Sequence, residues 1–132
     1  MITKINHVGI VARNTGEVAS TFSNLFGFEV SQKLVIPGQF KSTLISKGDA
    51  IIELIEPISS EGTIARFLEK RGGGLHHVSL EVDNIDEEIK SLKTKGAQLL
   101  SEKPIEATKE ARVTFVHPNS TEGTLIELIE RR

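Results

Sequence analysis

Two segments of the chain that lie 70 residues apart carry the same pattern, and this repeat limits the folds that the chain can adopt. The first is INHVGIVARNT, residues 5–15, and the second is LHHVSLEVDNI, residues 75–85. Three identical pairs line up at this offset: His7 with His77, Val8 with Val78, and Asn14 with Asn84. A repeat at a fixed offset is typical of one structural unit that occurs twice.

Each repeated segment leads into a pattern that is typical of a helix with one apolar face. Apolar residues recur three or four positions apart, which is the helical spacing. They are Val18, Phe22, Leu25 and Phe26 in the first copy, and Ile85, Ile89 and Leu92 in the second. Asn14 and Asn84, each with a Glu three residues later, fit a capping pair at the helix start. Gly27 and Gly96 stand where glycine commonly ends a helix.

Three strand-like runs follow each predicted helix. They cover residues 28–36, 39–46 and 50–57 in the first half, and residues 97–103, 111–118 and 123–130 in the second. The sequence therefore predicts the element order βαβββ twice, which is an α+β fold class.

We expect the two copies to form one domain of two modules. The first module covers residues 1–58 and the second covers residues 75–132. Residues 59–74 join them through a short amphipathic helix and a glycine-rich hinge. A module of about 60 residues hardly buries its own sheet. The modules must therefore pack together, either within one chain or across a dimer.

A carboxylate recurs in the middle of an apolar run in both halves. Glu53 lies in IIELIE, residues 51–56, and Glu127 lies in LIELIE, residues 125–130. A lone carboxylate among apolar side chains loses several kcal/mol of hydration unless it is paired or binds a metal. Side chains alternate along a strand, so His7 and His77 lie on the more polar face of their strands.

These four side chains predict a metal site. Two His and two Glu at equivalent places in two halves can meet in one cleft. Such a set suits a divalent transition metal with positions left open for water or substrate. We expect His76 and His117 to be structural, since neither has an equivalent in the other half.

The composition excludes several classes of function. A net charge of −2 gives no electrostatic footprint for nucleic acid or an anionic membrane. No apolar run approaches the roughly 20 residues that a spanning helix needs. The chain has no cysteine, so any metal must be held by His and carboxylate. We expect a cytoplasmic protein that binds neither nucleic acid nor membrane.

Four stretches carry a resemblance to a known family: HVGIVARN, IIELIEP, GGGLHHVSLEVDNI and TFVHPNSTEGTLIELIE. They resemble the vicinal-oxygen-chelate superfamily, which includes glyoxalase I, bleomycin-resistance proteins and dioxygenases. Within it the sequence is most similar to methylmalonyl-CoA epimerases. The resemblance implies paired βαβββ modules in a U-shaped mixed sheet around a metal-binding cleft, usually as a homodimer.

The resemblance also implies ligands and a reaction. The implied metal ligands are His7, Glu53, His77 and Glu127, and the implied ion is Co, Mn, Ni or Zn. The implied reaction inverts the α-carbon of an acyl-CoA substrate, methylmalonyl-CoA, through an enolate. Glu127 is implied as one proton-transfer group, and Glu53 is a fourth ligand, a second base, or both in turn.

The sequence departs from the family pattern in two places. Some relatives carry a second catalytic Glu on the strand that corresponds to residues 39–46, but no Asp or Glu occurs between Ser31 and Gly48. The second proton transfer then falls to Lys41, to a water molecule or to Glu53, or the chain is not an epimerase. The stretch PIEATKEAR also lacks the glycine-rich segment that is usual there.

Other functions fit the same residues. Glyoxalase I also moves a proton beside a metal-bound enediolate, with a glutathione rather than a CoA substrate. A binding protein that sequesters a small molecule would belong to a different class, but such proteins generally lose the metal residues. An iron-dependent dioxygenase is disfavoured because Glu53 would crowd the position that oxygen needs.

Overall fold

The computed structural model describes all 132 residues, and its contacts divide them into two compact units. One unit comprises residues 7–76, and the other comprises residues 1–6 and 77–132. The elements, in chain order, are β1 (Ile2–Val11), α1 (Thr15–Phe26), β2 (Glu29–Ile36), β3 (Phe40–Lys47), β4 (Ala50–Pro57), α2 (Thr63–Arg71), β5 (Gly74–Val82), α3 (Ile85–Thr94), β6 (Ile105–Thr108), β7 (Ala111–Val116), the 3-10 helix η1 (Pro118–Thr121) and β8 (Ile126–Arg131).

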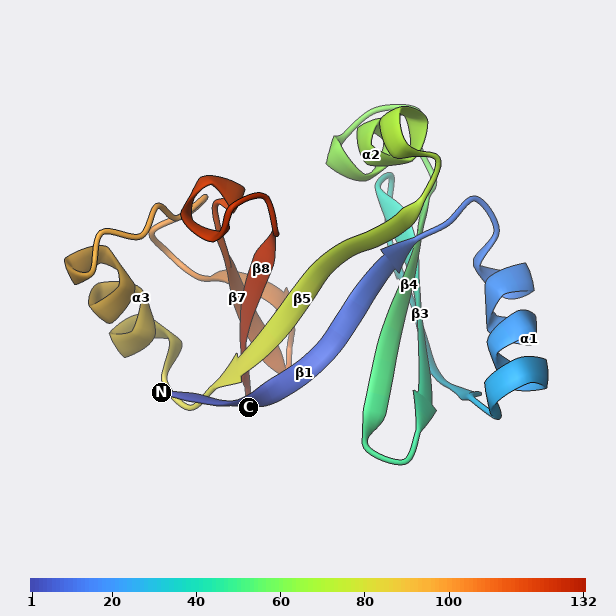
Figure 1. Ribbon diagram of the computed structural model, residues 1–132, viewed down its shortest axis with the longest axis horizontal. Helices are drawn as coiled ribbons and strands as arrows, with labels where there is room; N and C mark the ends of the chain where they lie inside the picture. The colour runs from blue at the N-terminus through green and yellow to red at the C-terminus, as the bar shows by residue number, and fades with distance from the viewer. The chain divides into compact units, whose positions relative to one another are not determined.

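In the unit of residues 7–76 the strands follow the order β2-β3-β4-β1. β1 runs parallel to β4, and β3 runs antiparallel to both β2 and β4. Helix α1 packs along β3 and β4 (Figure 1). The core under this helix is formed by Ala19, Ile45 and Leu54. Of the apolar residues that predicted the helix, Val18 and Phe22 pack against this core, whereas Leu25 and Phe26 are exposed.

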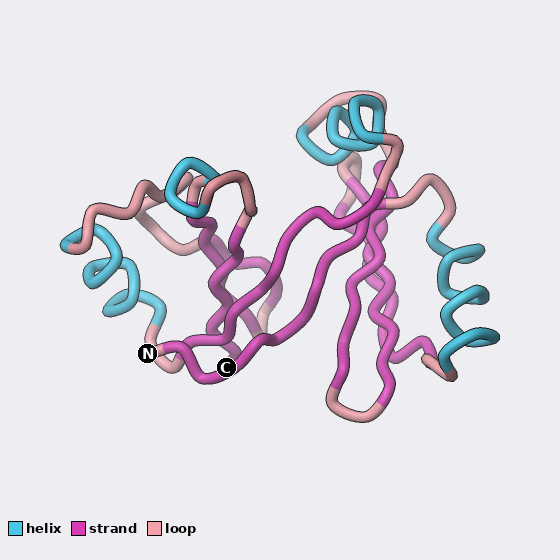
Figure 2. Tube along the Cα trace, viewed as in Figure 1, coloured by secondary structure: helices cyan, strands magenta, loops and turns pink.

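The other unit repeats this arrangement in the order β5-β8-β7-β6. β5 runs parallel to β8, and helix α3 lies against β8 (Figure 2). A core of buried aliphatic side chains lies under this helix. The register of the central parallel pair is also repeated. Gly9 lies opposite Glu53 in one unit, and Ser79 lies opposite Glu127 in the other. The α+β fold class and the doubled βαβββ order are confirmed.

The strand predicted over residues 97–103 is wrong. That segment makes only an isolated bridge between Leu99 and Val116, and β6 lies further along the chain. The carbonyl of Ser101 accepts a hydrogen bond from the Thr114 hydroxyl at 2.8 Å instead of entering a ladder. Pro104 has no N–H for strand pairing, so the ladder begins after it.

Helices α1 and α3 each begin with two side-chain caps. The side chains of Asn14 and Asn84 accept hydrogen bonds from the backbone N–H three residues on, as predicted. A carboxylate from the neighbouring strand adds a second cap in each unit. Glu56 accepts from the Thr15 N–H, and Glu130 accepts from the Ile85 N–H, both at 2.9 Å. Glu56 and Glu130 are the last residues of the two repeated runs, IIELIE and LIELIE.

The two capping carboxylates have lowered pKa values. Burial raises the pKa of Glu56, but the Thr15 N–H and the Lys41 ammonium outweigh it, so the pKa falls below its ordinary value. For Glu130 the Ile85 N–H is the largest cause, and the Arg112 guanidinium adds to the lowering. Both acids are therefore ionised at neutral pH and complement the positive end of a helix.

Helix α2 ends in a glycine-rich turn that approaches β1 closely. Gly73 has a φ of +103°, and a Cβ on it would lie 2.9 Å from the carbonyl oxygen of Val11. The neighbouring Gly72 has a φ of +73°, but no atom lies within 4 Å of its Cβ position. Only glycine therefore lets α2 pack on Val11 and Ile55, which share a core with Leu68.

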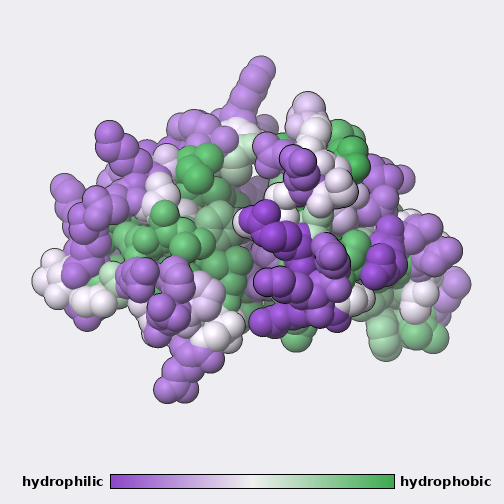
Figure 3. All heavy atoms as spheres, turned by 90° about the horizontal axis from the view of Figure 1, so that it is seen from above, coloured by the Kyte–Doolittle hydropathy of each residue, from purple (hydrophilic) through white to green (hydrophobic).

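Apolar side chains also reach the surface between the charged ones (Figure 3). The edge strand β2 is exposed along nearly its whole length. No helix of the structure has both the length and the apolar character that a membrane crossing requires.

We expect the Glu130→Gln protein to unfold more easily at pH 7, by about 1 kcal/mol, because a cap of α3 loses its charge. The folded-state pKa of Glu130 lies below its ordinary value of 4.5, so the stabilisation is present above pH 4.5 and is lost as pH falls through the lowered pKa. Urea unfolding from pH 7 to pH 3 measures this effect. Glu61→Gln, at an exposed position, is the control, and equal losses in both proteins would contradict the cap.

Replacing Gly73 with Ala should destabilise the protein by about 3 kcal/mol, because a backbone clash adds to the strain of a positive φ. The matched Gly72→Ala protein has the strain without the clash, and we expect about 1 kcal/mol. Thermal and urea unfolding of both proteins measure the difference. Similar losses would show that the approach of Gly73 to Val11 carries no weight.

Candidate functional site

In the unit of residues 7–76, β1 and β4 place a histidine and a carboxylate together. His7 Nε2 lies 3.5 Å from Glu53 Oε1. The parallel register puts Gly9 opposite Glu53, so His7, two residues before Gly9, points to the same face of the sheet. His7 is buried, and the Glu53 side chain is 19 % exposed. Two of the four side chains that the sequence predicted for a metal site, His7 and Glu53, are therefore close to each other.

The second oxygen of this carboxylate is held by a serine from β3. The Ser42 hydroxyl donates a hydrogen bond of 2.7 Å to Glu53 Oε2. Ser42 is buried, and Leu44, two residues on, lies directly opposite Glu53 across the β3–β4 ladder. The carboxylate is therefore fixed through both oxygens, one by Ser42 and one towards His7.

The sequence left Lys41 as one candidate for the second proton-transfer group. Its position in the structure rules out this role. Neighbouring residues on a strand point to opposite faces. Lys41 therefore lies on the α1 face, opposite to Ser42, and its ammonium is 3.2 Å from Glu56 Oε2. The positive charge stabilises the cap of α1 and is turned away from Glu53.

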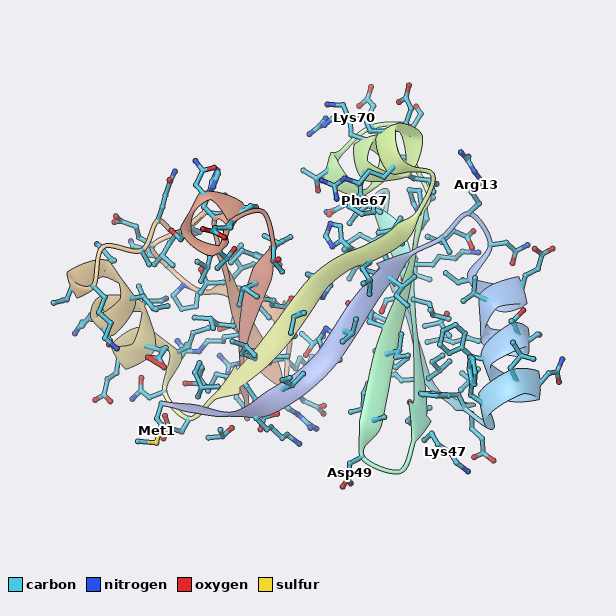
Figure 4. The ribbon with its side chains drawn as sticks, in the orientation of Figure 1. Met1, Arg13, Lys47, Asp49, Phe67 and Lys70 are labelled. Carbon is cyan, nitrogen blue, oxygen red and sulfur yellow. The ribbon has the colours of Figure 1, made fainter.

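Helix α2 closes one end of the face that carries Glu53. Phe67 points from α2 towards the sheet, whereas Lys70 points outward (Figure 4). The Phe67 ring packs edge-on against the imidazole of His76, with ring centroids 4.9 Å apart. Burial lowers the pKa of His76 from its ordinary 6.5, while the charge of Glu53 acts in the opposite direction. The His76 imidazole is therefore uncharged at pH 7 and borders this face.

The other unit holds the second His–Glu pair on β5 and β8. His77 and Glu127 are buried, and the atoms that they can offer to a metal lie within 4.8 Å of each other. Ser79 lies opposite Glu127 in the parallel register, on the face of His77. Its hydroxyl is fully buried and has no hydrogen-bond partner.

These features fit a divalent cation in chemical terms. Imidazole nitrogen and carboxylate oxygen are common ligands of Co, Mn, Ni and Zn. A buried hydroxyl without a partner costs about 1–3 kcal/mol, and it marks a place that a ligand or water molecule can satisfy. The donor types of His77 and Glu127 could hold a metal ion on this face, and the Ser79 hydroxyl lies on the same face.

His117 takes no part in either pair. Its Nδ1 accepts a hydrogen bond from the Asn119 N–H at 3.0 Å and caps the short helix η1. The structural role that the sequence predicted for His117 is confirmed. The alternation of faces places Ser79 on the face of His77, but the sequence predicted neither its unpartnered hydroxyl nor the bond from Ser42 to Glu53.

An open groove of about 800 Å³ lies elsewhere in the unit of residues 7–76, between α1 and strands β2 and β3. Its lining includes the ion pair of Lys41 and Glu56, the α1 start and apolar side chains of β2, and it contains no histidine. The groove therefore lacks the chemistry of the His–Glu pairs, and its size alone does not identify a site.

We expect the metal-free Ser79→Ala protein to be as stable as the unchanged chain or more stable, because the change removes a buried hydroxyl that has no partner. Ser42→Ala should instead lower the free energy of unfolding by about 1 kcal/mol, since it removes a hydrogen bond to a charged group. Urea unfolding in a chelator measures both. A loss in Ser79→Ala as large as that in Ser42→Ala would show that Ser79 has a partner after all.

Comparison with known proteins places the chain in a family. Residues 6–115 match the model of the Glyoxalase/Bleomycin resistance protein/Dioxygenase superfamily. The mitochondrial methylmalonyl-CoA epimerase of Bos taurus is 34% identical over 127 residues, which cover 95% of this chain and 73% of the bovine protein. The crystal structure of methylmalonyl-CoA epimerase from Mycobacterium tuberculosis has a TM-score of 0.92 at 27% identity, covering 99% of this chain and 89% of that one.

A further solved structure is a methylmalonyl-CoA epimerase in complex with methylmalonyl-CoA and NH4+. It has a TM-score of 0.90 at 25% identity and covers 99% of this chain and 96% of that chain. The family model covers residues 6–115, and the structural likeness extends over 99% of the chain. The chain belongs to the Glyoxalase/Bleomycin resistance protein/Dioxygenase superfamily.

Proposed function

We propose that this chain is an isomerase that interconverts the (R) and (S) forms of methylmalonyl-CoA. The observation that carries the proposal is the likeness to methylmalonyl-CoA epimerases along almost the whole chain. The two buried His–Glu pairs supply the donor chemistry that such a reaction needs.

The metal site belongs to the proposal. His7, His77 and Glu127 hold one divalent cation, and Glu53 is the fourth ligand or lies beside the others. The types of these residues and their repetition in both units support this set. The bound cation supplies a Lewis acid that lowers the energy of an enolate.

The chain's own carboxylates move the proton. Glu127 takes the α-proton of the substrate: the C–H bond breaks, an O–H bond forms, and the electron pair moves into the thioester carbonyl as an enolate. A second acid returns a proton to the opposite side of the same carbon, and the electron pair forms the new C–H bond. In the reverse direction the two groups exchange roles.

Glyoxalase I remains the competing function, because the same four side chains suit an enediolate. The likeness to epimerases over nearly the full length favours the CoA thioester over the glutathione adduct. A protein that only sequesters a small molecule would have no use for the two His–Glu pairs.

The assembly and the setting are also part of the proposal. We propose a homodimer in the cytoplasm, supported by the resemblance to the superfamily and by the exposed edge strand β2. Size-exclusion chromatography with light scattering measures the first, and cell fractionation measures the second.

Loss of a ligand's hydrogen-bond partner typically lowers metal affinity 10- to 100-fold, about 1.4–2.7 kcal/mol. We expect the His77→Asn and Glu127→Gln proteins to lose more cobalt(II) affinity than this, because the ligand itself is removed. Each removes a donor of the proposed site. Chelator competition with the purified proteins measures the affinity. The matched controls are His117→Asn, which keeps a capping side chain, and Glu130→Gln, three residues beyond Glu127. Unchanged cobalt affinity in the first two proteins would overturn the ligand set.

In D2O the metal-loaded protein should place deuterium at the α-carbon of methylmalonyl-CoA and convert each epimer into the other. The hemithioacetal of methylglyoxal and glutathione should not react at a comparable rate. Mass spectrometry and chiral analysis of the thioester measure the first reaction, and lactoylglutathione absorbance measures the second. Turnover of the glutathione adduct alone would replace the proposed function with that of glyoxalase I.

A further inference from the structure

Ser79 is fully buried, and its hydroxyl has no hydrogen-bond partner. It lies on β5 in the unit of residues 1–6 and 77–132, on the face that carries His77 and Glu127. An alanine would fill nearly the same space without the cost of a buried hydroxyl that bonds to nothing. A buried polar group of this kind needs an explanation, and a partner that forms when the site binds a ligand supplies one.

The register of the strands decides which side chain this hydroxyl can reach. Ser79 lies directly opposite Glu127 in the parallel pair of β5 and β8. Neighbouring strands lie about 4.8 Å apart, whereas residues two positions apart along one strand are about 6.7 Å apart. The serine side chain is short, so Glu127 across the ladder is nearer to it than His77 on its own strand.

The unit of residues 7–76 shows what a buried serine does beside a site carboxylate. There Gly9 takes the position of Ser79, and the hydroxyl comes instead from Ser42 on β3, which donates a hydrogen bond of 2.7 Å to Glu53. On β7 the position that corresponds to Ser42 is the apolar Val113. Each unit therefore brings a buried serine to its site carboxylate, but from a different strand, and the bond is formed in one unit and unformed in the other.

We infer that Ser79 positions Glu127 for a divalent cation: when the carboxylate holds the ion, the Ser79 hydroxyl donates a hydrogen bond to it. A carboxylate has enough lone pairs to accept such a bond in addition to its other contacts. The bond is charge-assisted, and bonds of this kind orient a ligand and raise metal affinity. The inference rests on the proposed metal site and adds a residue that acts through Glu127 rather than as a ligand.

A simpler account is that a small side chain is needed at this point of β5 and that an enclosed water molecule satisfies the hydroxyl. The two accounts differ in what removal of the hydroxyl does to metal affinity. If the hydroxyl only packs or holds water, the Ser79→Ala protein binds a cation as tightly as the unchanged chain. If the hydroxyl positions Glu127, cation affinity falls although the metal-free protein loses no stability.

The experiment measures cobalt(II) affinity by chelator competition and stability by urea unfolding in a chelator. We expect Ser79→Ala to bind cobalt about 10-fold more weakly or worse, with an unchanged or higher urea midpoint. The matched control is Thr114→Val, because the Thr114 hydroxyl is as deeply buried in the same unit but donates to the Ser101 carbonyl, and Thr114 lies opposite Leu128 on the other face. Thr114→Val should show the reverse, with lower stability and unchanged cobalt affinity.

A double-mutant cycle tests whether the hydroxyl acts through Glu127. In the Glu127→Ala protein the acceptor is gone, so adding Ser79→Ala should change the cobalt affinity by less than about twofold.

Equal cobalt affinity in Ser79→Ala and the unchanged chain would overturn the inference, and so would a 10-fold loss that persists in the Glu127→Ala background. If the unchanged chain binds no cobalt, the proposed metal site fails and the inference fails with it. That result differs from a site that binds cobalt equally well without the Ser79 hydroxyl. Turnover does not enter either measurement, so failure of the proposed epimerisation is told apart from both.

Discussion

The alternation of side chains along β4 and β8 is the constraint on which the rest of the structure depends. Each strand carries two acids three residues apart, and an odd spacing sends them to opposite faces. Glu53 and Glu127 point to the face of the histidines, whereas Glu56 and Glu130 reach the first turn of a helix. One short apolar run thus supplies a site carboxylate and a helix cap, because both positions are fixed by a single strand register.

The two units are equivalent in their backbone but not in the surroundings of their site carboxylates. The unit of Glu53 has Gly9 opposite the acid and takes its hydroxyl from β3. In the other unit the serine is Ser79 on the central strand, and the position on β7 that corresponds to Ser42 is the apolar Val113. One acid is therefore held by a bonded hydroxyl, and the other lies beside a hydroxyl with no partner.

Much of the fold followed from local rules, and the exceptions have identifiable causes. The Asn14 and Asn84 caps, both long helices and the His7–Glu53 pair could be predicted because spacing and face alternation are local properties. The strand predicted at residues 97–103 was wrong because the carbonyl groups before Pro104 accept hydrogen bonds from side chains instead of pairing with a strand. Apolar spacing does not reveal such bonds. The Ser42 bond needed the register of β3 against β4, which depends on the turn that joins these two strands rather than on composition.

The cores that stabilise the units and the side chains of the candidate site lie on opposite faces of the strands. This separation explains how the face of the histidines and of Glu53 and Glu127 can hold so many polar groups. The core under α1 and the core under α3 are built from aliphatic side chains on the faces that carry neither histidine nor site carboxylate. The capping carboxylates, with their lowered pKa values, stabilise the helices from those same faces. Substitutions on the opposite face therefore change polar contacts without opening a cavity in the helix-covered cores. A fold built in this way can change the polar side chains of one face while its architecture stays the same.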